Sequence, residues 1–144
     1  MLEQLEPLVP NEKAWKSERG SLRIRVPHAR VLVFIEEGHL EEDFAPLIQT
    51  ASNDALKQGA PLSLFVDCYD LVGYAPSVRK APTDWLMAHR EQVDVQHMLV
   101  RSKITKMGLS VASLALGGLL KGHVSRASFQ AALDQAVSTL KRGY

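Results

Sequence analysis

Acidic side chains follow directly on an apolar run of this chain. Residues 62–66 are apolar apart from Ser63, and Asp67 and Asp70 come next. A close pair of carboxylates can perform acid–base chemistry or hold a metal ion. The alternative, which we favour, is structural: Asp67 accepts hydrogen bonds from loop amides and Asp70 forms a local turn. No third carboxylate or histidine stands at a spacing that would complete a magnesium or calcium site.

Cys68 offers a second kind of chemistry, because a thiolate beside a histidine can act as a nucleophile. His89 and His97 are its candidate partners in space. A single cysteine at the end of an apolar strand is more often a small buried side chain, and nothing near it in the sequence lowers the pKa of the thiol. We therefore expect no enzyme. An enzyme using Asp67, Cys68 and His89 is the least favoured alternative.

Motifs for cofactors and metals are absent from the sequence. The five histidines are scattered, with no pair at i, i+4 on a helix and no His-x-His pair, so we expect no zinc or iron site. There is no G-x-G-x-x-G, no P-loop and no G-x-S-x-G elbow. We expect no cofactor and no metal.

Basic residues surround the start of a predicted helix at Ser102. Ser102 is a good N-cap, and Arg101 and Lys103 lie beside it. Free amides at a helix N-terminus together with basic side chains can bind phosphate or a lipid head group. In α/β sheets such sites gather at the carboxyl ends of strands, which is where the segment after residue 66 lies. The predicted ligand-binding residues are Asp67, Tyr69, Tyr74, Arg101, Ser102 and Lys103. The alternative is a capped helix with solvated charges.

Composition excludes several classes of partner. A length of 144 residues suits one domain, and 46% hydrophobic with 23% charged residues is ordinary for a globular protein. The formal net charge of +1 predicts no general attraction to nucleic acid. The single cysteine rules out an internal disulfide. We find no signal peptide and no apolar run long enough for a transmembrane segment, so we expect a cytoplasmic protein.

Hydrophobic periodicity predicts an α/β domain over residues 21–144, preceded by an N-terminal tail at residues 1–20. Two prolines interrupt the tail, and Trp15 is expected to fold back onto the domain. The expected order is β-β-α-β-α-β-α-β-α, with a mixed four- to five-stranded sheet packed with about four helices. The predicted strands are 22–26, 31–35, 62–67, 95–100 and 119–124, and the predicted helices are 44–56, 83–92, 102–116 and 125–140. Residues 69–82 are expected to form a loop.

The third predicted helix has an unusual composition, because residues 108–120 contain no charged side chain. A surface helix normally has a polar face. Its expected inner stripe consists of Ile104, Met107, Val111, Leu114 and Ala115. Either this helix is buried on most sides, or it exposes an apolar face to another subunit or a membrane surface. A homodimer contact through this helix is therefore one expectation.

With this order of elements, residues 21–140 resemble the SpoIIAA-like branch of the STAS superfamily, which is described alongside CRAL-TRIO lipid-binding domains. The resemblance is carried by residues 30–38, 65–74, 89–90 and 125–140. The family often has a strand ending in Asp, then a turn with Gly and an aromatic residue, as in Asp67, Gly73 and Tyr74. The resemblance implies a bacterial, non-catalytic STAS-like module that recognises a partner protein or a small ligand, such as an anion or a lipid. The alternative that it implies is a carrier of lipid or another apolar ligand.

Ser77 marks where the chain departs from that family. Anti-sigma-factor antagonists of the superfamily carry a phosphorylatable serine in an Asp-Ser-Ser-Gly-like motif after the corresponding strand. Ser77 stands at the matching distance past Asp67, but the second serine and the glycine are missing. The resemblance makes Ser77 a candidate phosphosite, and phosphate at a helix N-terminus is favourable. The alternative is an ordinary residue of a helix's first turn.

Overall fold

The computed structural model describes residues 2–142. Two short 3-10 turns, Glu42–Phe44 and Arg90–Gln92, accompany the main elements. The strands are β1 (Glu3–Leu5), β2 (Glu12–Lys16), β3 (Gly20–His28), β4 (Val31–Leu40), β5 (Leu62–Tyr74), β6 (Val93–Leu99) and β7 (Leu120–His123). The helices are α1 (Ala45–Gln58), α2 (Pro76–Ala88), α3 (Lys103–Ala115) and α4 (Arg126–Arg142).

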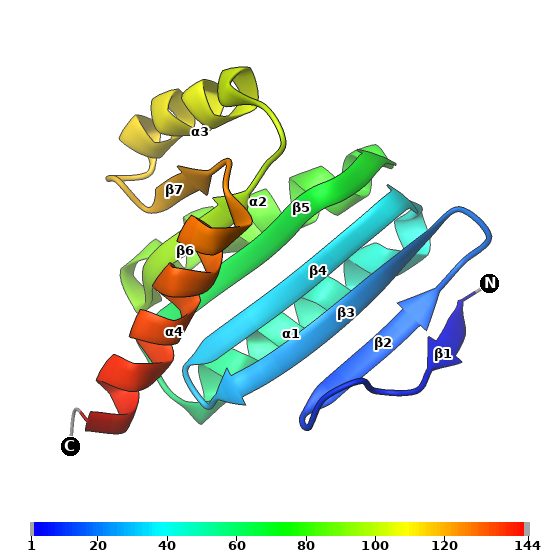
Figure 1. Ribbon diagram of the computed structural model, residues 1–144, viewed down its shortest axis with the longest axis horizontal. Helices are drawn as coiled ribbons and strands as arrows, with labels where there is room; N and C mark the ends of the chain where they lie inside the picture. Colours follow the sequence, from blue (N-terminus) through cyan, green and yellow to red (C-terminus); the bar gives the residue numbers. More distant parts are fainter. Residues whose placement is uncertain (1, 143–144) are drawn as a thin grey trace.

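A single mixed sheet holds all seven strands in the order of the chain, β1 to β7 (Figure 1). The pairs from β1 to β4 are antiparallel, and the pairs from β4 to β7 are parallel. Helices α1, α2 and α3 connect the parallel strands. Helices α1 and α2 cover one face of the sheet, and α4 covers the other. From β3 onward, the predicted order of elements is therefore confirmed.

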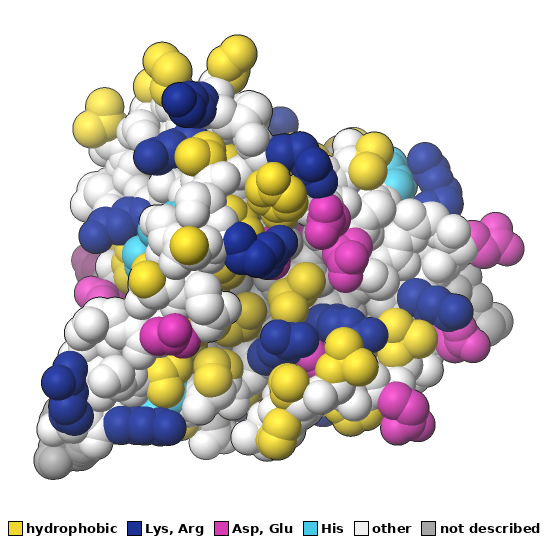
Figure 2. Space-filling model, viewed as in Figure 1, with side chains coloured by type: hydrophobic (Ala, Val, Ile, Leu, Met, Phe, Trp, Pro, Cys, Tyr) yellow, Lys and Arg dark blue, Asp and Glu magenta, His cyan; other side chains and the backbone are white. Residues whose placement is uncertain are grey.

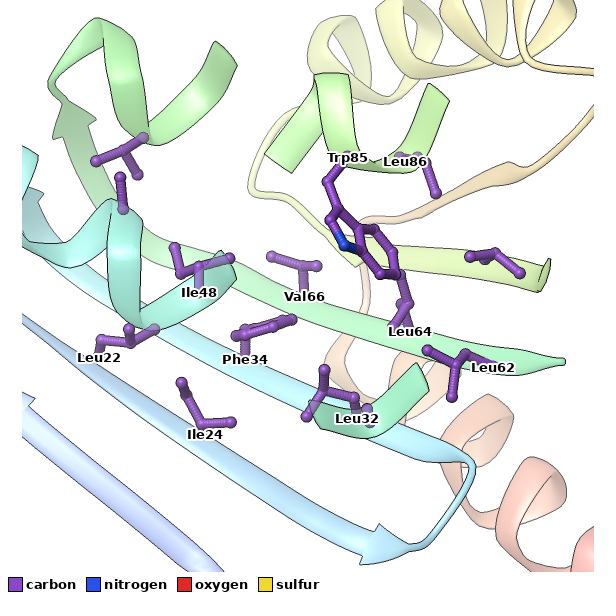
Figure 3. Close-up of a cluster of buried hydrophobic side chains, with 14 of the residues drawn as sticks. Leu22, Ile24, Leu32, Phe34, Ile48, Leu62, Leu64, Val66, Trp85 and Leu86 are labelled. Atoms are coloured by element: carbon purple, nitrogen blue, oxygen red, sulfur yellow. The ribbon is translucent and has the colours of Figure 1, made fainter. Parts of the chain in front are cut away.

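The core lies on both faces of β4 and β5, because successive side chains of a strand point to opposite faces. Leu32 and Phe34 of β4 pack under α1 and α2 together with Leu64 of β5 (Figure 3). Val33 and Phe65 pack on the opposite face, against α4. Both strands are thus buried on both faces of the sheet, as their continuous apolar runs predict.

The N-terminal segment contributes two strands that the sequence did not predict. β1 and β2 extend the sheet beyond β3, so the expected four to five strands become seven. Ala14 of β2 is completely buried, and Trp15 packs against the main core as expected. The expectation of a tail without regular structure is wrong for residues 3–5 and 12–16. The strand was missed because one of its inward side chains is the charged Glu12.

The segment after Asp67 also differs from the expectation of a loop. β5 is 13 residues long and continues to Tyr74, which pairs with Leu40 at the end of β4. α2 begins directly afterwards, with Pro76 in its first turn and Pro82 in its interior. The strand continues past its buried part because β4 extends equally far beside it and supplies backbone partners.

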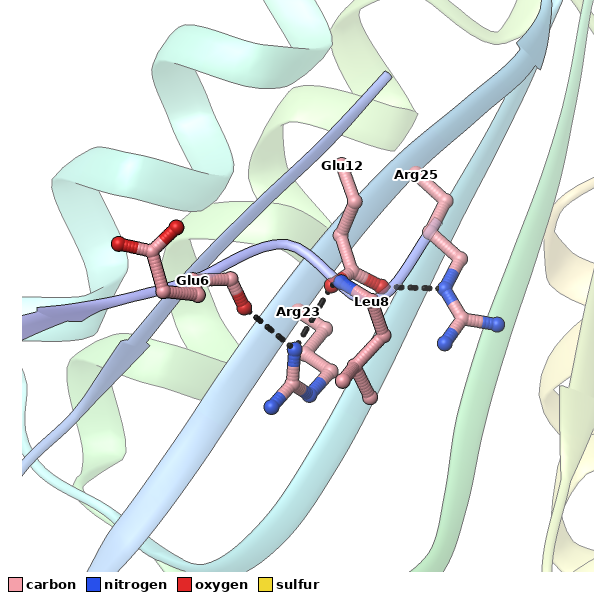
Figure 4. Close-up of polar contacts among 5 residues, drawn as sticks. All are labelled: Glu6, Leu8, Glu12, Arg23 and Arg25. Atoms are coloured by element: carbon pink, nitrogen blue, oxygen red, sulfur yellow. Dashed lines mark hydrogen bonds and ion pairs between the residues drawn. The ribbon is translucent and has the colours of Figure 1, made fainter. Parts of the chain in front are cut away.

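Glu12 anchors β2 to β3. Its side chain is completely buried and accepts hydrogen bonds from Arg23 Nη1 at 2.7 Å, Arg25 Nε at 2.5 Å and the Leu8 amide at 2.8 Å (Figure 4). Burial opposes ionisation of this carboxyl. The Leu8 amide and the two guanidinium groups more than offset that effect, so the pKa of Glu12 lies below its ordinary value.

We predict that Glu12→Ala lowers the free energy of unfolding by about 3 kcal/mol, because it leaves two arginines and an amide without their shared acceptor. Urea unfolding followed by circular dichroism measures the change. The control is Glu3→Ala, which removes only an exposed ion pair with Lys16 and should change stability by less than about 1 kcal/mol. Equal effects of the two substitutions would contradict the anchoring role.

Candidate functional site

Asp67 lies where β5 emerges from under α4. Its side chain is buried, and its Oδ1 accepts a hydrogen bond from the Tyr69 amide at 3.1 Å. Its Oδ2 accepts from Arg126 Nη1 of α4 at 2.7 Å. Asp67 therefore has the structural role that we favoured from the sequence, with the addition of a partner from a distant helix.

Tyr69 lies on the same face of β5 as Asp67 and contacts two arginines. The guanidinium carbon of Arg101 lies 4.3 Å from the centre of the Tyr69 ring, and that of Arg126 lies 5.4 Å from it. Arg101 also donates to the Tyr69 carbonyl at 3.0 Å and to Asp70 Oδ1 at 2.8 Å. We call Asp67, Tyr69, Asp70, Arg101 and Arg126 the arginine–tyrosine cluster. Cation–π contact and ion pairing both hold it together.

The charges of this cluster balance, because each arginine is paired with one aspartate. An anion bound here would have to compete with Asp67 and Asp70 for the guanidinium groups. Both arginine side chains remain more than half exposed, so a ligand can reach them. The geometry supports a fixed structural unit with accessible donors rather than a vacant anion site.

The structure unites only some of the predicted ligand-binding residues. Asp67, Tyr69 and Arg101 meet in the cluster, and Ser102 and Lys103 follow it at the exposed start of α3. The predicted N-cap is confirmed, since Ser102 Oγ accepts from the Thr105 amide at 3.0 Å. Tyr74 lies at the far end of β5, seven strand residues beyond Asp67, and thus about 20 Å away. It is not part of this site.

Arg126 is the residue that sequence reasoning missed. It occupies the first turn of α4, directly after Ser125. A positive charge is unfavourable at the N-terminus of a helix, where the dipole favours negative groups. An arginine in this position therefore indicates a specific acidic partner elsewhere in the fold, and that signal was available in the sequence.

The residues of the alternative enzyme hypothesis do not converge. Asp67 and Cys68 are neighbours in β5, so their side chains point to opposite faces of the sheet, and Cys68 packs in the core under α1 and α2. His89 follows the last residue of α2, at the opposite end of the sheet from Cys68, and stacks on Trp85. His97 stacks on Phe65 on the α4 side.

The Cys68 thiol is also poorly suited to act as a nucleophile. Burial raises its pKa, and the neighbouring Glu36 carboxyl raises it further. The thiol Sγ lies 3.4 Å from Glu36 Oε1 and donates to it. Within residues 2–142, no group of three His, Cys, Asp or Glu side chains is placed to hold a metal ion.

The side chains of α3 are turned the opposite way from the prediction. The expected inner residues Ile104, Met107, Val111 and Leu114 are 83%, 68%, 69% and 81% exposed. Hydrophobic side chains project from this helix at the top of Figure 2. We call these four residues the α3 apolar stripe.

The inner face of α3 consists instead of Lys106, Leu109 and Ser113, and it continues with the buried Leu116 directly after the helix. Ser113 is buried, and its Oγ accepts a hydrogen bond from the Leu120 amide at 3.0 Å. Lys106 and Leu109 lie over Gly122 of β7, where an added Cβ would stand 3.0 Å from Lys106 Cγ and 3.2 Å from Leu109 Cδ1. The absence of a side chain at Gly122 lets the helix approach β7 through this face.

Comparisons with solved structures identify the architecture. The chain superposes on the crystal structure of an uncharacterized protein of the DUF3478 family, described as having a SpoIIAA-like fold, from Shewanella loihica PV-4. The TM-score is 0.66 at 14% sequence identity, over 82% of this chain and 98% of that chain. This chain has a SpoIIAA-like fold. No protein-family model and no curated protein matches the sequence.

The SpoIIAA-like fold places Ser77 in the first turn of α2. Its Oγ is buried and has no hydrogen-bond partner among residues 2–142. A kinase could modify this hydroxyl only after the start of α2 had opened. Phosphorylation of Ser77 stays a prediction, and the observed placement agrees with the alternative interpretation of a first-turn residue.

A groove of about 750 Å³ lies between α1 and the end of the sheet formed by β2 and β3. Trp15, Ile24 and Val26 line it from the sheet, and Leu47 and Ala51 line it from α1. The volume falls in the range of small-molecule sites. Separately, no helix within residues 2–142 is long and apolar enough to cross a membrane.

Glu36 and His97 titrate abnormally in this fold. Burial raises the pKa of Glu36 from 4.5 to about 7. Burial, helped by the charge of His123, lowers the pKa of His97 from 6.5 to about 4. Because the pKa of Glu36 is higher in the folded state, its contribution to the free energy of unfolding is fully present below pH 4.5. This contribution is lost as the pH rises through 7. The His97 contribution has the opposite sign, since it is lost as the pH falls from 6.5 to 4.

We predict that Glu36→Gln removes the Glu36 contribution to the pH dependence of stability and leaves that of His97. We compare the free energy of unfolding of this variant with that of the unsubstituted protein at each pH. The difference should shift in favour of the variant by up to about 3 kcal/mol between pH 4.5 and pH 8, at about 1.4 kcal/mol per pKa unit. Urea unfolding at several pH values measures the difference. Glu37→Gln, at the exposed neighbouring position, is the control and should leave the pH profile unchanged. Parallel pH profiles for Glu36→Gln and the unsubstituted protein would show that Glu36 titrates normally.

Proposed function

We propose that this chain is a non-catalytic STAS-type binding module that recognises a partner protein through the α3 apolar stripe. The observation that carries the proposal is the exposure of Ile104, Met107, Val111 and Leu114 on one helix. Soluble monomers rarely expose contiguous large apolar side chains without a binding role. The SpoIIAA-like fold supports a regulatory or binding module but names no partner.

The neighbouring polar residues fit the rim of such a surface. Arg101 precedes Ser102, the N-cap of α3, and Lys103 is the first residue of the helix. A protein interface typically has an apolar centre and a polar rim, with arginine enriched in it. Asp67, Tyr69 and Ser102 support this rim through the contacts described above. The predicted ligand-binding residues, apart from Tyr74, thus serve protein recognition better than they serve a free anion.

The α3 apolar stripe can be tested by differential capture. Affinity-tagged chain is used to capture proteins from a lysate of cells that express it, and mass spectrometry quantifies what is retained. We predict that Val111→Glu reduces retention of the specific partner at least tenfold, because a charge in the centre of the stripe would be buried without a counter-charge.

Val72→Glu is the matched control. Val72 is 88% exposed at the end of β5, away from α3, so the same change there should leave retention unchanged. The proposal is contradicted if both variants retain the same proteins in the same amounts, or if nothing is retained beyond what empty resin holds.

The groove beside α1 favours a second candidate function, the binding of a lipid or another apolar ligand. We predict that Ala51→Phe, which fills the groove from α1, at least halves the amount of ligand that copurifies with the chain. Mass spectrometry of an organic extract gives the ligand-to-protein ratio. Ala131→Phe, at an exposed position of α4, is the control. A chain that purifies without any organic ligand would contradict this second function.

A further inference from the structure

The spacing of the α3 apolar stripe is that of a helix–helix seam. Ile104, Met107, Val111 and Leu114 are separated by three, four and three residues. At 3.6 residues per turn these four large side chains span an arc of about 80°, which is narrow. A helix lying in a membrane surface shows a wider apolar face, whereas a strict three–four repeat matches the knobs of one helix packing on another.

The two flanks of the stripe also suit a helical partner. Gly108, Ala112 and Ala115 line one side, and all three are exposed. An added Cβ at Gly108 would meet no atom within 4 Å, so the space beside it is open. Small residues at such positions let two helix backbones approach closely. Lys103 and Ser110 line the other side, at the helix surface.

The stripe is complementary to a copy of itself. It is symmetric about residue 109, so an antiparallel pair of α3 helices places Ile104 against Leu114 of the second copy and Met107 against Val111. Such self-complementarity is what a two-fold dimer contact requires. The geometry points to an antiparallel α3–α3 dimer of this chain, an inference that rests on the proposed function and names its partner.

Charge selects the antiparallel arrangement over the parallel one. The charged residues of α3 are Lys103 and Lys106, both in its first turns, and residues 108–120 carry no charge. Antiparallel packing places Lys103 beside the C-terminal end of the other α3, where the helix dipole is negative. Parallel packing would place Lys103 of one copy beside Lys103 of the other.

The size of the contact sets its strength. One pair of 13-residue helices buries less surface than the roughly 1,200 Å² of a standard stable interface. The dimer should therefore form in the micromolar range and dissociate on dilution. Sedimentation velocity between about 1 and 500 µM tests this, with a weight-average mass that rises towards twice the monomer mass.

Val111→Glu should raise the dimer dissociation constant at least tenfold, because the glutamate of each copy would be buried against Met107 of the other copy without a counter-charge. Val72→Glu, exposed on β5, should leave it unchanged. The inference is overturned if the unsubstituted chain stays monomeric across this range, or if it dimerises equally well with Val111→Glu.

Disulfide trapping tests the register. In a Cys68→Ser background, chains with Ile104→Cys are mixed with chains carrying Leu114→Cys and a different tag. The antiparallel dimer brings these two positions together, while the two 104 positions stand about 15 Å apart. Mixed disulfides should therefore exceed Ile104→Cys self-disulfides at least tenfold. Preferred self-disulfides would indicate a parallel pair and overturn the assignment.

The failure of this inference is distinguishable from failure of the proposed function. A monomeric chain that still captures another protein through Val111 contradicts the dimer and leaves protein recognition intact. A monomeric chain that captures nothing contradicts both. A monomeric chain that sediments with phosphatidylglycerol vesicles, and loses this with Val111→Glu, assigns the stripe to membranes and overturns the dimer.

Discussion

Burial of β4 and β5 on both faces is the constraint on which the rest of this structure depends. The two strands are parallel neighbours, and their alternating side chains need an apolar layer on each side. α1 and α2 supply one layer, and α4 must return to supply the other. That return brings the N-terminus of α4 to Asp67 in the middle of β5, where the buried part of the strand ends. Arg126 meets Asp67 there because the packing of Phe129 against Phe65 has already fixed the helix.

The same constraint explains why α3 is left largely exposed. Both faces of the central strands are already covered by the other three helices. α3 connects β6 to β7, and β7 has only four residues to pack against. Leu109, Ser113 and Leu116 are enough to hold it there. The remaining apolar residues have no surface within residues 2–142 to cover them, so they face outward.

Sequence periodicity predicted the elements that carry a continuous apolar pattern, and it failed where charge or glycine decides the packing. The order from β3 to α4 follows from apolar runs and helical stripes. β2 escaped because its inward position 12 is a glutamate whose charge is satisfied by arginines of β3, a match that only the paired register reveals. The strand nature of residues 69–74 depends on hydrogen bonds to β4 rather than on burial.

The orientation of α3 could not be read from the sequence for a related reason. The helix has two stripes with the same spacing, and the more apolar one is the natural choice for the inside. The less apolar one is selected by two features of β7: Gly122 leaves room for Lys106 and Leu109, and the Leu120 amide donates a hydrogen bond to Ser113 Oγ. Both determinants lie in β7, outside the helix. A stripe that is too apolar for the surface was therefore the one signal of a recognition face.

The arginine–tyrosine cluster connects this recognition face to the core. Arg101 is the residue before the N-cap of α3, and it is held by the Tyr69 carbonyl and Asp70 of β5. Arg126 begins α4 and is held by Asp67 of the same strand. The starts of both helices are thus tied to three residues of β5, on either side of one aromatic ring. Asp67, whose carboxylate could have served acid–base chemistry, instead fixes the start of α4 through Arg126, while Tyr69 and Asp70 of the same strand fix Arg101, the position from which α3 presents its apolar stripe.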